Sequence, residues 1–325
     1  MLSNVIDTAL ELSVIGSFTR IGYAARSRLH DWRRAKTDAL RGRTVLVTGP
    51  TSGLGREATV QLAALDARVI LVGRTPSKLE TLRDELAHRH GEDRFPIVEA
   101  DLGSLASTRS AAADILASEP RLDVVIDNAG AIFPKRRVSE DGIEASMALM
   151  VVSPFTLVRA LLPLLSRSPD ARVIAVTSGG MYTQALDLDD MGFQRGEYSG
   201  AKAYARAKRA QVAMIREWSR RVPRNAVRFN AMHPGWADTP GLSEMLPGFH
   251  RLMGPVLRTP AEGVDTLIWL ATDPHAGTDG GQLFLDRRPR PFDRLPSTRL
   301  RLDDRRRLWN AVVRLSVDRD PGGPR

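Results

Sequence analysis

The chain has 325 residues, of which 42% are hydrophobic and 26% are charged, and it contains no cysteine. This composition is typical of a globular protein long enough for one large α/β domain or two smaller domains. The lack of cysteine excludes disulfides, thiolate metal sites and cysteine nucleophiles, and we expect no metal site. No apolar run approaches about 18 residues, and Asp7 and Glu11 interrupt the apolar N-terminus, so we expect a cytoplasmic protein.

The formal net charge of +9 is concentrated at the two ends of the chain. Segments 1–43 and 287–325 hold the arginine excess, whereas 44–286 is close to neutral. No nucleic-acid-binding motif accompanies this charge, so we expect no nucleic-acid partner. The N-terminal segment fits either a helix packed on its own domain or peripheral contact with a membrane. Its apolar side is predicted to hold Val5, Leu12, Ile15, Phe18 and Ile21.

From residue 44 onward, short β-branched runs alternate with longer amphipathic stretches. The predicted strands are 44–48, 69–73, 96–99, 123–127, 172–177, 226–232 and 282–285. Helices are predicted between them, for example over 56–65, 78–90 and 105–118. Apolar strands separated by helices indicate a parallel sheet covered on both faces, and right-handed crossovers make it doubly wound. We therefore predict an α/β Rossmann-type fold with seven parallel strands.

The predicted organisation is a single domain with two extensions. Residues 1–43 form a basic amphipathic lead, and residues 44–286 form the Rossmann domain. Residues 287–325 form an arginine-rich tail, which is predicted to be irregular over 287–299 and helical over 303–315.

The first predicted strand runs into a glycine-rich turn and then into a helix. Glycines let a backbone approach a pyrophosphate, and a helix N-terminus supplies N–H groups and a positive dipole end. A tight turn without a ligand is the alternative, which the position between a strand and a helix disfavours. The residues predicted to bind a dinucleotide here are Gly49, Thr51, Ser52, Gly53, Leu54 and Gly55.

The end of the second predicted strand indicates which dinucleotide binds. A carboxylate at this point accepts the ribose hydroxyls of NAD, whereas an arginine accommodates the 2′-phosphate of NADP. The chain has Gly73 followed by Arg74, 19 residues after Gly55. The alternative is that Arg74 is only a solvated surface residue. We expect NADP(H) to be preferred over NAD(H).

Two segments, Tyr198–Lys202 and Tyr204–Lys208, match the pattern Tyr-x-x-x-Lys. On a helix, a lysine one turn after a tyrosine can lower the pKa of the phenol, which then serves as an acid–base group in carbonyl reduction. Ser178 follows the fifth predicted strand, 26 residues before Tyr204, and its hydroxyl can polarise a carbonyl oxygen.

Together, these motifs resemble the short-chain dehydrogenase/reductase (SDR) family over roughly residues 44–286. Thr48-Gly49-x-x-x-Gly53-x-Gly55 is similar to the nucleotide signature of the family, and the run 234–239 resembles the Pro-Gly-x-x-x-Thr segment that cradles the nicotinamide. In the family, this proline follows the tyrosine by about 30 residues. Pro234 follows Tyr204 by 30 residues and Tyr198 by 36, so the resemblance selects Tyr204 and Lys208.

The resemblance implies the remaining site residues. Tyr204 would be the acid–base group, Lys208 would lower its pKa and bind ribose, and Ser178 would polarise the substrate oxygen. Asp101, beside Leu102, resembles the aspartate that bonds the adenine. The other residues that the resemblance places against the cofactor are Asn128, Ala129, Gly130, Pro234, Gly235, Trp236 and Thr239. His233 is interpreted as structural.

Two departures from the family pattern accompany this match. Asp127 stands where the family has the first residue of Asn-Asn-Ala-Gly, and Met150 stands where many members have an asparagine that holds a water beside the lysine. A thioether is a poor hydrogen-bond partner, so proton relay takes another route, or turnover is slow. A catalytically inactive cofactor-binding scaffold is the alternative function.

The segment 236–257 is predicted to form the substrate lid. It is rich in Leu, Met, Phe and Pro, which favours a lipophilic carbonyl or alcohol as substrate.

Further segments resemble one branch of the family, which has an N-terminal lead and no firmly assigned substrate. Relatives form dimers or tetramers through the helix bearing the tyrosine and its neighbour, and for this chain the resemblance leaves both a monomer and a homo-oligomer open.

Overall fold

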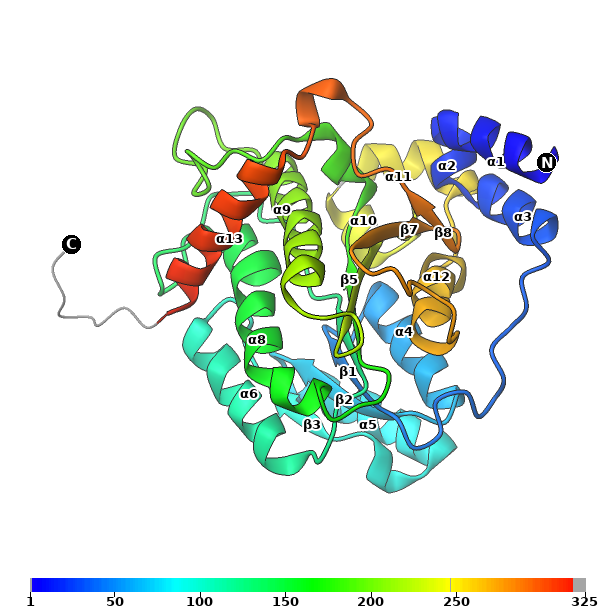
Figure 1. The fold of residues 1–325 in the computed structure, drawn as a ribbon, viewed down its shortest axis with the longest axis vertical. Helices are drawn as coiled ribbons and strands as arrows, with labels where there is room; N and C mark the ends of the chain where they lie inside the picture. The colour runs from blue at the N-terminus through cyan, green and yellow to red at the C-terminus, as the bar shows by residue number, and fades with distance from the viewer. Residues whose placement is uncertain (1, 246, 318–325) are drawn as a thin grey trace, which may run out of the picture.

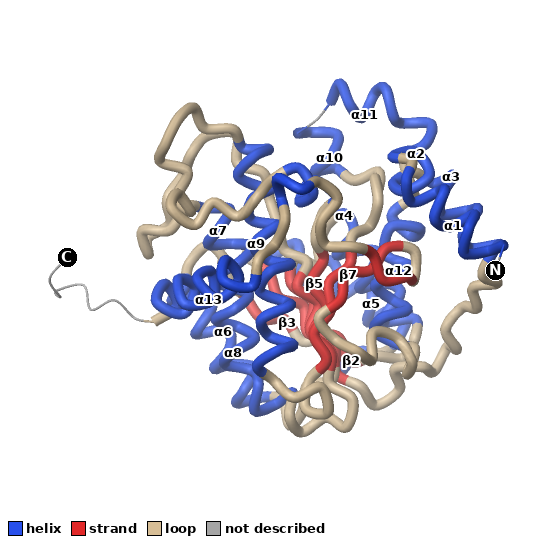
Figure 2. The backbone as a smooth tube through the Cα atoms, turned by 45° about the horizontal axis from the view of Figure 1, so that its top comes forward, coloured by secondary structure: helices blue, strands red, loops and turns tan. Residues whose placement is uncertain are grey.

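The computed structural model describes residues 2–245 and 247–317 and is built around one sheet with the order β3-β2-β1-β4-β5-β6-β7-β8. Neighbouring strands from β3 to β7 pair in parallel, as predicted, and helices cover both faces of the sheet (Figures 1 and 2). The strands are β1 (Thr44–Thr48), β2 (Arg68–Gly73), β3 (Ile97–Glu99), β4 (Val124–Asp127), β5 (Arg172–Val176), β6 (Arg228–Met232), β7 (Gln282–Leu285) and β8 (Arg288–Arg290).

The predicted count of seven strands is wrong by one. The segment predicted to be irregular after residue 286 forms β8, which runs antiparallel to β7. Asp286 and Arg287 join the two strands with φ angles of 55° each, the left-handed geometry of a two-residue hairpin. The sequence lacks the usual Asn-Gly signal of such a turn, so the hairpin was not predicted.

Two helical layers enclose two hydrophobic cores. Alternate residues of β1 divide between the cores, since Val45 and Val47 face one and Leu46 the other. The first layer contains α4 (Gly53–Ala64), α5 (Pro76–His90) and α12 (Pro260–Thr272). The second layer contains α6 (Leu105–Ser118), α8 (Ser153–Leu165) and α9 (Gly200–Arg221). The sheet is therefore a fully covered parallel sheet, which explains why its strands are almost continuously apolar.

The helix α8 continues an unusual apolar run. It is preceded by α7 (Ala145–Met147) and a π-helical turn over Ala148–Val152. The whole run Ala145–Leu165 has the length and apolar composition of a membrane span, contrary to the expectation from the sequence, but most of it is buried inside the fold. A buried core helix accounts for this run.

The N-terminal lead forms α1 (Leu2–Leu12), α2 (Val14–Phe18) and α3 (Arg20–Leu29), which lie beside β7 and β8 (Figure 1). Most of its predicted apolar side does not face the domain. Phe18 is buried, but Leu12, Ile15 and Ile21 are exposed, and the side chain of Val5 lies outside the described residues. The lead is packed on its own domain, as one of the two predicted alternatives requires, through the Phe18 ring and through buried polar contacts.

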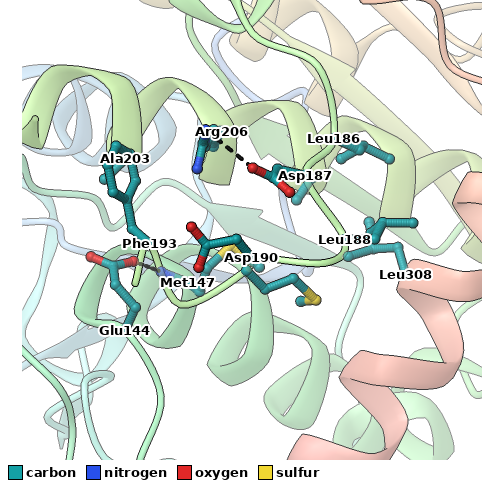
Figure 3. Close-up of a pocket in the computed structure, with 12 residues that line it drawn as sticks. Glu144, Met147, Leu186, Asp187, Leu188, Asp190, Phe193, Ala203, Arg206 and Leu308 are labelled. Atoms are coloured by element: carbon teal, nitrogen blue, oxygen red, sulfur yellow. Dashed lines mark hydrogen bonds and ion pairs between the residues drawn. The ribbon is translucent and has the colours of Figure 1, made fainter. Parts of the chain in front are cut away.

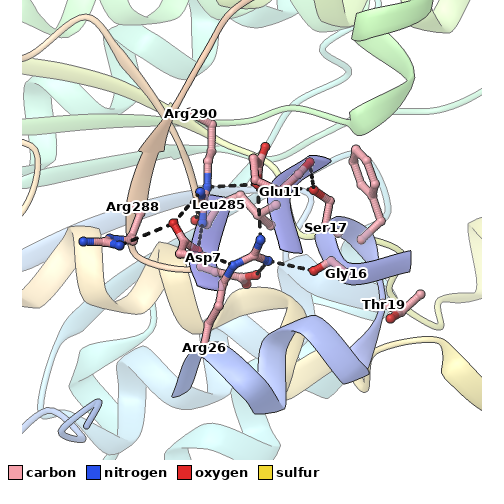
Figure 4. Close-up of polar contacts among 12 residues, drawn as sticks. Asp7, Glu11, Gly16, Ser17, Thr19, Arg26, Leu285, Arg288 and Arg290 are labelled. Carbon is pink, nitrogen blue, oxygen red and sulfur yellow. Dashed lines mark hydrogen bonds and ion pairs between the residues drawn. The ribbon is translucent and has the colours of Figure 1, made fainter. Parts of the chain in front are cut away.

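A buried cluster of charges attaches this lead to the β7–β8 hairpin (Figure 4). The Arg26 guanidinium lies 2.6 Å from Asp7 and 2.7 Å from Asp286, whose carboxylate also pairs with Arg258 at 2.6 Å. Arg290 pairs with Asp7 at 2.9 Å. Burial alone would raise the pKa of Asp7, but hydrogen bonds from Arg290 and Arg26 outweigh it and hold that pKa well below its usual range. Removing one partner would leave a buried charge uncompensated, which is strongly destabilising.

The C-terminal helix α13 (Leu302–Ser316) confirms the helix predicted over 303–315 and packs across α8 and α9. Leu308 and Val312 are buried, and Trp309 packs edge-on against Phe155 and Trp218 at centroid distances of 5.1 and 4.8 Å. α8 and α9 are the helices through which the resemblance implied an oligomer. Any assembly on this face would therefore have to include α13.

Leu308→Ala should reduce the free energy of unfolding by about 2–4 kcal/mol, because it leaves a cavity between α13 and the core. Leu302→Ala is the matched control on the same helix. Leu302 is 41% exposed whereas Leu308 is 1% exposed, so the control should change stability by less than about 0.5 kcal/mol. Urea denaturation followed by tryptophan fluorescence measures both, and equal effects would show that α13 is not packed as described.

Candidate active site

The glycine-rich turn joins β1 to α4 at the carboxyl edge of the sheet. Gly49 and Gly53 have φ angles of +65° and +50°, and a Cβ added to Gly55 would lie 2.0 Å from the carbonyl oxygen of Gly49. The helix begins at Gly53, three residues before the predicted start, with Ser52 as the extended residue before it. The first turn of α4 therefore consists of Gly53, Leu54 and Gly55, whose N–H groups point toward the loop, as an anion site requires.

The loop after β4 braces this turn. The Thr48 hydroxyl accepts hydrogen bonds from the backbone N–H groups of Asn128 and Ala129, both at 3.0 Å. The Asn128 amide in turn donates to the carbonyl oxygens of Thr48 and Gly49 at 3.0 and 3.2 Å. Asn128 thus fixes the two loops relative to each other, which explains the residue type without requiring a direct cofactor contact.

The predicted nicotinamide segment meets the glycine-rich turn. A Cβ added to Gly53 would lie 3.5 Å from the Thr239 side chain. Gly235 has a φ of +71°, and a Cβ there would lie 2.4 Å from Arg258 Nε. The structure therefore brings together two motifs that are about 180 residues apart in the chain, at the edge where parallel α/β sheets bind their ligands.

The residues predicted to hold the adenosine half lie further along the same edge. Arg74 follows β2, is exposed, and forms no hydrogen bond or ion pair within residues 2–245 and 247–317. Arg56, in contrast, pairs with Glu85 at 2.5 Å. Asp101 accepts a hydrogen bond from the Gly103 N–H at 2.8 Å, and Leu102 between them is buried. Of the two arginines, Arg74 is therefore the one that is free for a phosphate.

Tyr204 and Lys208 lie one turn apart on α9. The helix begins at Gly200 because the Ser199 hydroxyl accepts from the Lys202 N–H at 3.4 Å. Burial raises the pKa of Tyr204, and a hydrogen bond with Ser178 opposes that shift. Lys208 Nζ donates to Val176 O at 2.7 Å and lies 5.8 Å from the Tyr204 ring centroid. The lowering of the Tyr204 pKa by Lys208 stays a prediction.

The rival pair, Tyr198 and Lys202, is not assembled into a comparable site. Tyr198 precedes α9, and its hydroxyl donates to Glu144 at 3.1 Å, while Lys202 is exposed. The two residues therefore do not share a helical face, although their spacing fits the pattern.

Met150 lies in the π-helical turn, next to the lysine. A Cβ on Gly130 would lie 3.3 Å from Met150 Sδ and 3.5 Å from Lys208 Nζ. π-helical turns occur frequently at functional sites. The thioether thus occupies the neighbourhood of the ammonium, as the sequence comparison with the family implied.

The sequence did not indicate that Phe18 belongs to this site. Its ring stacks on His233 at 5.2 Å and on Trp236 at 5.4 Å, and its carbonyl oxygen accepts from the Trp236 N–H at 2.7 Å. A Cβ on Gly179, beside Ser178, would lie 2.4 Å from the Phe18 ring. The N-terminal lead therefore supports both the Ser178 loop and the nicotinamide segment.

His233 is wholly buried, and burial places its pKa well below 6.5. Its Nε2 has no hydrogen-bond partner among the described residues. A neutral ring stacked on Phe18 fits the structural interpretation and gives no support for a catalytic base.

The predicted lid contains α10 (Pro240–Met245) and α11 (Pro247–Met253). Phe249 packs edge-on against Trp236 at 5.0 Å, and His250 lies 2.9 Å from Asp238. Leu252 points away from the fold and is 78% exposed. The aromatic contact of Phe249 and the polar contact of His250 hold α11 to the nicotinamide segment, and the N–H groups of Leu242 and Ser243 on α10 donate to Thr239 O at 3.0 and 3.1 Å.

Figure 3 shows a pocket on a neighbouring face of α9, away from Tyr204 and Lys208. It includes Ala203, Arg206 and Ala210 of that helix, and the Arg206 guanidinium pairs with Asp187 at 3.2 Å. It is separate from the assembled catalytic candidates.

Comparison with known proteins identifies the class that this fold and site define. The family model for short chain dehydrogenase matches residues 43–247. The chain therefore belongs to the short-chain dehydrogenase/reductase family, whose members are oxidoreductases with a nicotinamide cofactor.

Among characterised relatives, the chain is 39% identical to dehydrogenase/reductase SDR family member 12 of Bos taurus, over 77% of this chain and 78% of that protein. This similarity confirms the branch that the sequence predicted. The chain is 38% identical to a putative daunorubicin C-13 ketoreductase of Streptomyces sp. (strain C5), over 78% and 86% of the two chains. It is 33% identical to retinol dehydrogenase 14 of Mus musculus, over 76% and 78%.

Solved structures agree with the fold. A short chain dehydrogenase from Shigella flexneri complexed with NADP has a TM-score of 0.64 and 27% identity, covering 78% of this chain and all of that one. A second from Escherichia coli complexed with NADPH has a TM-score of 0.63 and 28% identity, covering 77% and 98%.

Proposed function

We propose that this protein interconverts a carbonyl and an alcohol on a lipophilic small molecule, with NADP(H) as cofactor. The observation that carries the proposal is the meeting of β5 and α9 at the carboxyl edge: the hydroxyl of Thr177, next to Ser178, donates to Lys208 O at 3.2 Å, and Tyr204 lies one helical turn before Lys208. Bound NADPH would supply the hydride in the reducing direction. Tyr204 would donate the proton to the developing alkoxide, and Ser178 would hold the substrate oxygen.

The residues around the predicted cofactor site fit a dinucleotide. The glycine turn leaves N–H groups of the first turn of α4 for the pyrophosphate, with Thr51 and Ser52 beside them. Two of the three Lys208 donors are used within the described residues, by Val176 O and Gln211 Oε1, which leaves one for ribose hydroxyls. Pro234, Gly235 and Thr239 would line the nicotinamide end.

The lipophilic substrate is favoured by the aromatic residues beside the site, Phe18, Trp236 and Phe249. The names of two relatives, a retinol dehydrogenase and a daunorubicin ketoreductase, are consistent with carbonyl–alcohol chemistry. The second candidate function is an inactive NADP-binding scaffold, which Met150 beside Lys208 motivates.

Tyr204→Phe should reduce kcat for NADPH-dependent reduction by roughly 10²–10⁴-fold, because the general acid is lost. NADPH affinity, measured by fluorescence titration, should change little. Tyr198→Phe is the matched control, since Tyr198 precedes α9 and its hydroxyl donates to Glu144 at 3.1 Å, and it should retain activity. NADPH binding without turnover on a broad panel of carbonyl compounds would favour the scaffold, and an active Tyr204→Phe variant would refute the mechanism.

Arg74→Ala should weaken NADPH binding by at least about tenfold while leaving NADH binding nearly unchanged, because a charge-assisted bond to the 2′-phosphate is lost. Arg83→Ala on α5 is the control, because Arg83 is also a surface arginine but pairs with Asp84 at 2.8 Å. Isothermal titration calorimetry with both cofactors decides the question. Equal losses for NADPH and NADH would mean that Arg74 does not read the phosphate.

We propose that this cytoplasmic enzyme also touches membranes peripherally. Leu12 is 83% exposed, and Ile15 and Ile21 are exposed on the same lead. The helix α11, which carries the exposed Leu252, lies near the lead in both views (Figures 1 and 2). Exposed arginines, Arg20 among them, accompany these residues. Apolar residues flanked by basic ones favour the surface of an anionic bilayer.

Serine substitution of Leu12, Ile15, Ile21 and Leu252 should abolish co-sedimentation with phosphatidylserine-containing vesicles, because the apolar contact is removed. The control substitutes serine at Leu116 and Val138, two exposed apolar residues elsewhere on the surface, and should still sediment. If the full-length protein stays in the supernatant at low salt, membrane contact through the lead is ruled out.

A further inference from the structure

A buried carboxylate lies behind the active-site lysine. Asp127 ends β4, next to the Asn128 loop, and is almost fully buried. Gln211 connects the two charged groups: Lys208 Nζ donates to Gln211 Oε1 at 3.2 Å, and Gln211 Nε2 donates to Asp127 Oδ2 at 2.7 Å. The other carboxylate oxygen, Oδ1, has no partner among the described residues. Two hydrogen bonds through Gln211 thus connect the buried Asp127 carboxylate to the Lys208 ammonium at the candidate active site.

The Lys208 ammonium and the Asp127 carboxylate are both buried, so they stabilise each other in place of solvent. Burial lowers the pKa of Lys208 to about 8, and the Asp127 carboxylate opposes that decrease. Burial raises the pKa of Asp127 to about 6, and Lys208 and Gln211 oppose that increase. Without a counter-charge, a buried lysine tends to lose its proton. Between these two values, both groups are charged.

Within the described part of the chain, the other elements around Lys208 present it with no second anion. β5 contributes the carbonyl oxygen of Val176, the π-helical turn contributes Met150, and the loop after β4 contributes Gly130. The nearest titratable group on α9 is Tyr204, whose ring centroid is 5.8 Å away. Asp127 is the charged group that acts on the lysine from within the fold.

A purely structural role for Asp127 would need only an acceptor for the Gln211 amide. An asparagine oxygen satisfies that requirement equally well, so the carboxylate adds a charge that the hydrogen bond does not need. The orphaned Oδ1 also shows that the carboxylate is not present to satisfy further donors. The charge itself is therefore the feature that needs a function.

We propose that Asp127 and Gln211 are positioning residues that keep Lys208 an ammonium ion, aimed toward the cofactor ribose and available to the Tyr204 proton transfer. The proposal rests on the function proposed above for Tyr204 and Lys208. It also accounts for activity with Met150 in place of a water-binding side chain, because the lysine keeps its charge through a counter-ion inside the protein.

Asp127→Asn tests the charge while preserving shape and an acceptor for Gln211. Removing the anion lowers the pKa of Lys208, so the lysine loses its proton at a lower pH. The alkaline limb of the pH–kcat profile for carbonyl reduction should therefore move to lower pH by about one unit or more, with roughly tenfold lower kcat on that limb. NADPH affinity at pH 6.5 should remain within about threefold, because Lys208 is still charged there.

The control is Asp123→Asn, directly before the start of the same strand. Asp123 is also buried, but it pairs with Arg121 at 3.1 Å and accepts from the Thr44 N–H and the Ser168 hydroxyl, at the end of β4 away from the lysine. Its pH profile should superimpose on that of the unmodified protein. A profile of Asp127→Asn that also superimposes would overturn the proposal.

A second measurement does not depend on turnover. The chain has only five lysines, Lys36, Lys78, Lys135, Lys202 and Lys208, so lysine labelled with ¹³C at Cε gives five NMR signals, and Lys208→Arg identifies the one of interest. The Lys208 signal should titrate at lower pH in Asp127→Asn than in the unmodified protein. In Gln211→Leu the decrease in titration pH should be smaller. This second variant replaces the first if Asp127→Asn fails to fold. An unchanged titration in a folded variant refutes the bridge. An active Tyr204→Phe enzyme would refute the proposed function and leave this result intact.

Discussion

The site depends on how the protein buries the ammonium of Lys208. Its position on α9 carries it under the carboxyl edge of β4 and β5, where Val176 O, Gln211 and the Asp127 carboxylate replace solvent. A charge in such surroundings is stable only if its partners are fixed. The parallel sheet supplies that rigidity, because β4 and β5 are central strands covered on both faces. Tyr204 lies one turn earlier on the same helix, which packs against the turn that follows Ser178.

A second set of buried charges acts at the opposite side of the site. Arg26, Asp286 and Arg258 link the N-terminal lead, the β7–β8 hairpin and the segment before α12. Arg258 also donates to the carbonyl oxygens of Ser17 and Phe18, and a Cβ on Gly235 would collide with its guanidinium. The ion cluster thus sets the position of Phe18, whose ring supports Trp236 and the loop after Ser178. The lead, which lies outside the 43–247 region matched to the family, is nevertheless part of the walls of the candidate site.

The two charge clusters differ in what they leave unsatisfied. In the N-terminal cluster, Arg26 donates to Asp7, Gly16 O, Asp286 and Glu11, so the charged groups are densely paired. In the lysine cluster, one carboxylate oxygen has no partner among the described residues, and Lys208 retains a free donor. A densely paired network fixes structure, whereas a sparsely paired one beside a candidate site is the kind of place where ligand chemistry occurs. We interpret the first cluster as architectural and the second as functional.

The sequence alone determined the parallel sheet, the glycine turn and the order of the site motifs, because periodicity and turn chemistry are local properties of the chain. The resemblance to the family favoured Tyr204 over Tyr198 by its distance to Pro234, and in the structure Ser199 caps α9 and leaves Tyr198 outside the helix. Only the tertiary structure decided that the lead buries its polar side, that β8 exists, and that Gln211 bridges Lys208 to Asp127. Gln211 and Asp127 are 84 residues apart, and Arg290 and Asp7 are 283 apart, so these side chains become partners only when the chain is folded. The β7–β8 hairpin is local in sequence, but its turn lacks the usual residue signal. No local pattern encodes the burial that makes these charges matter.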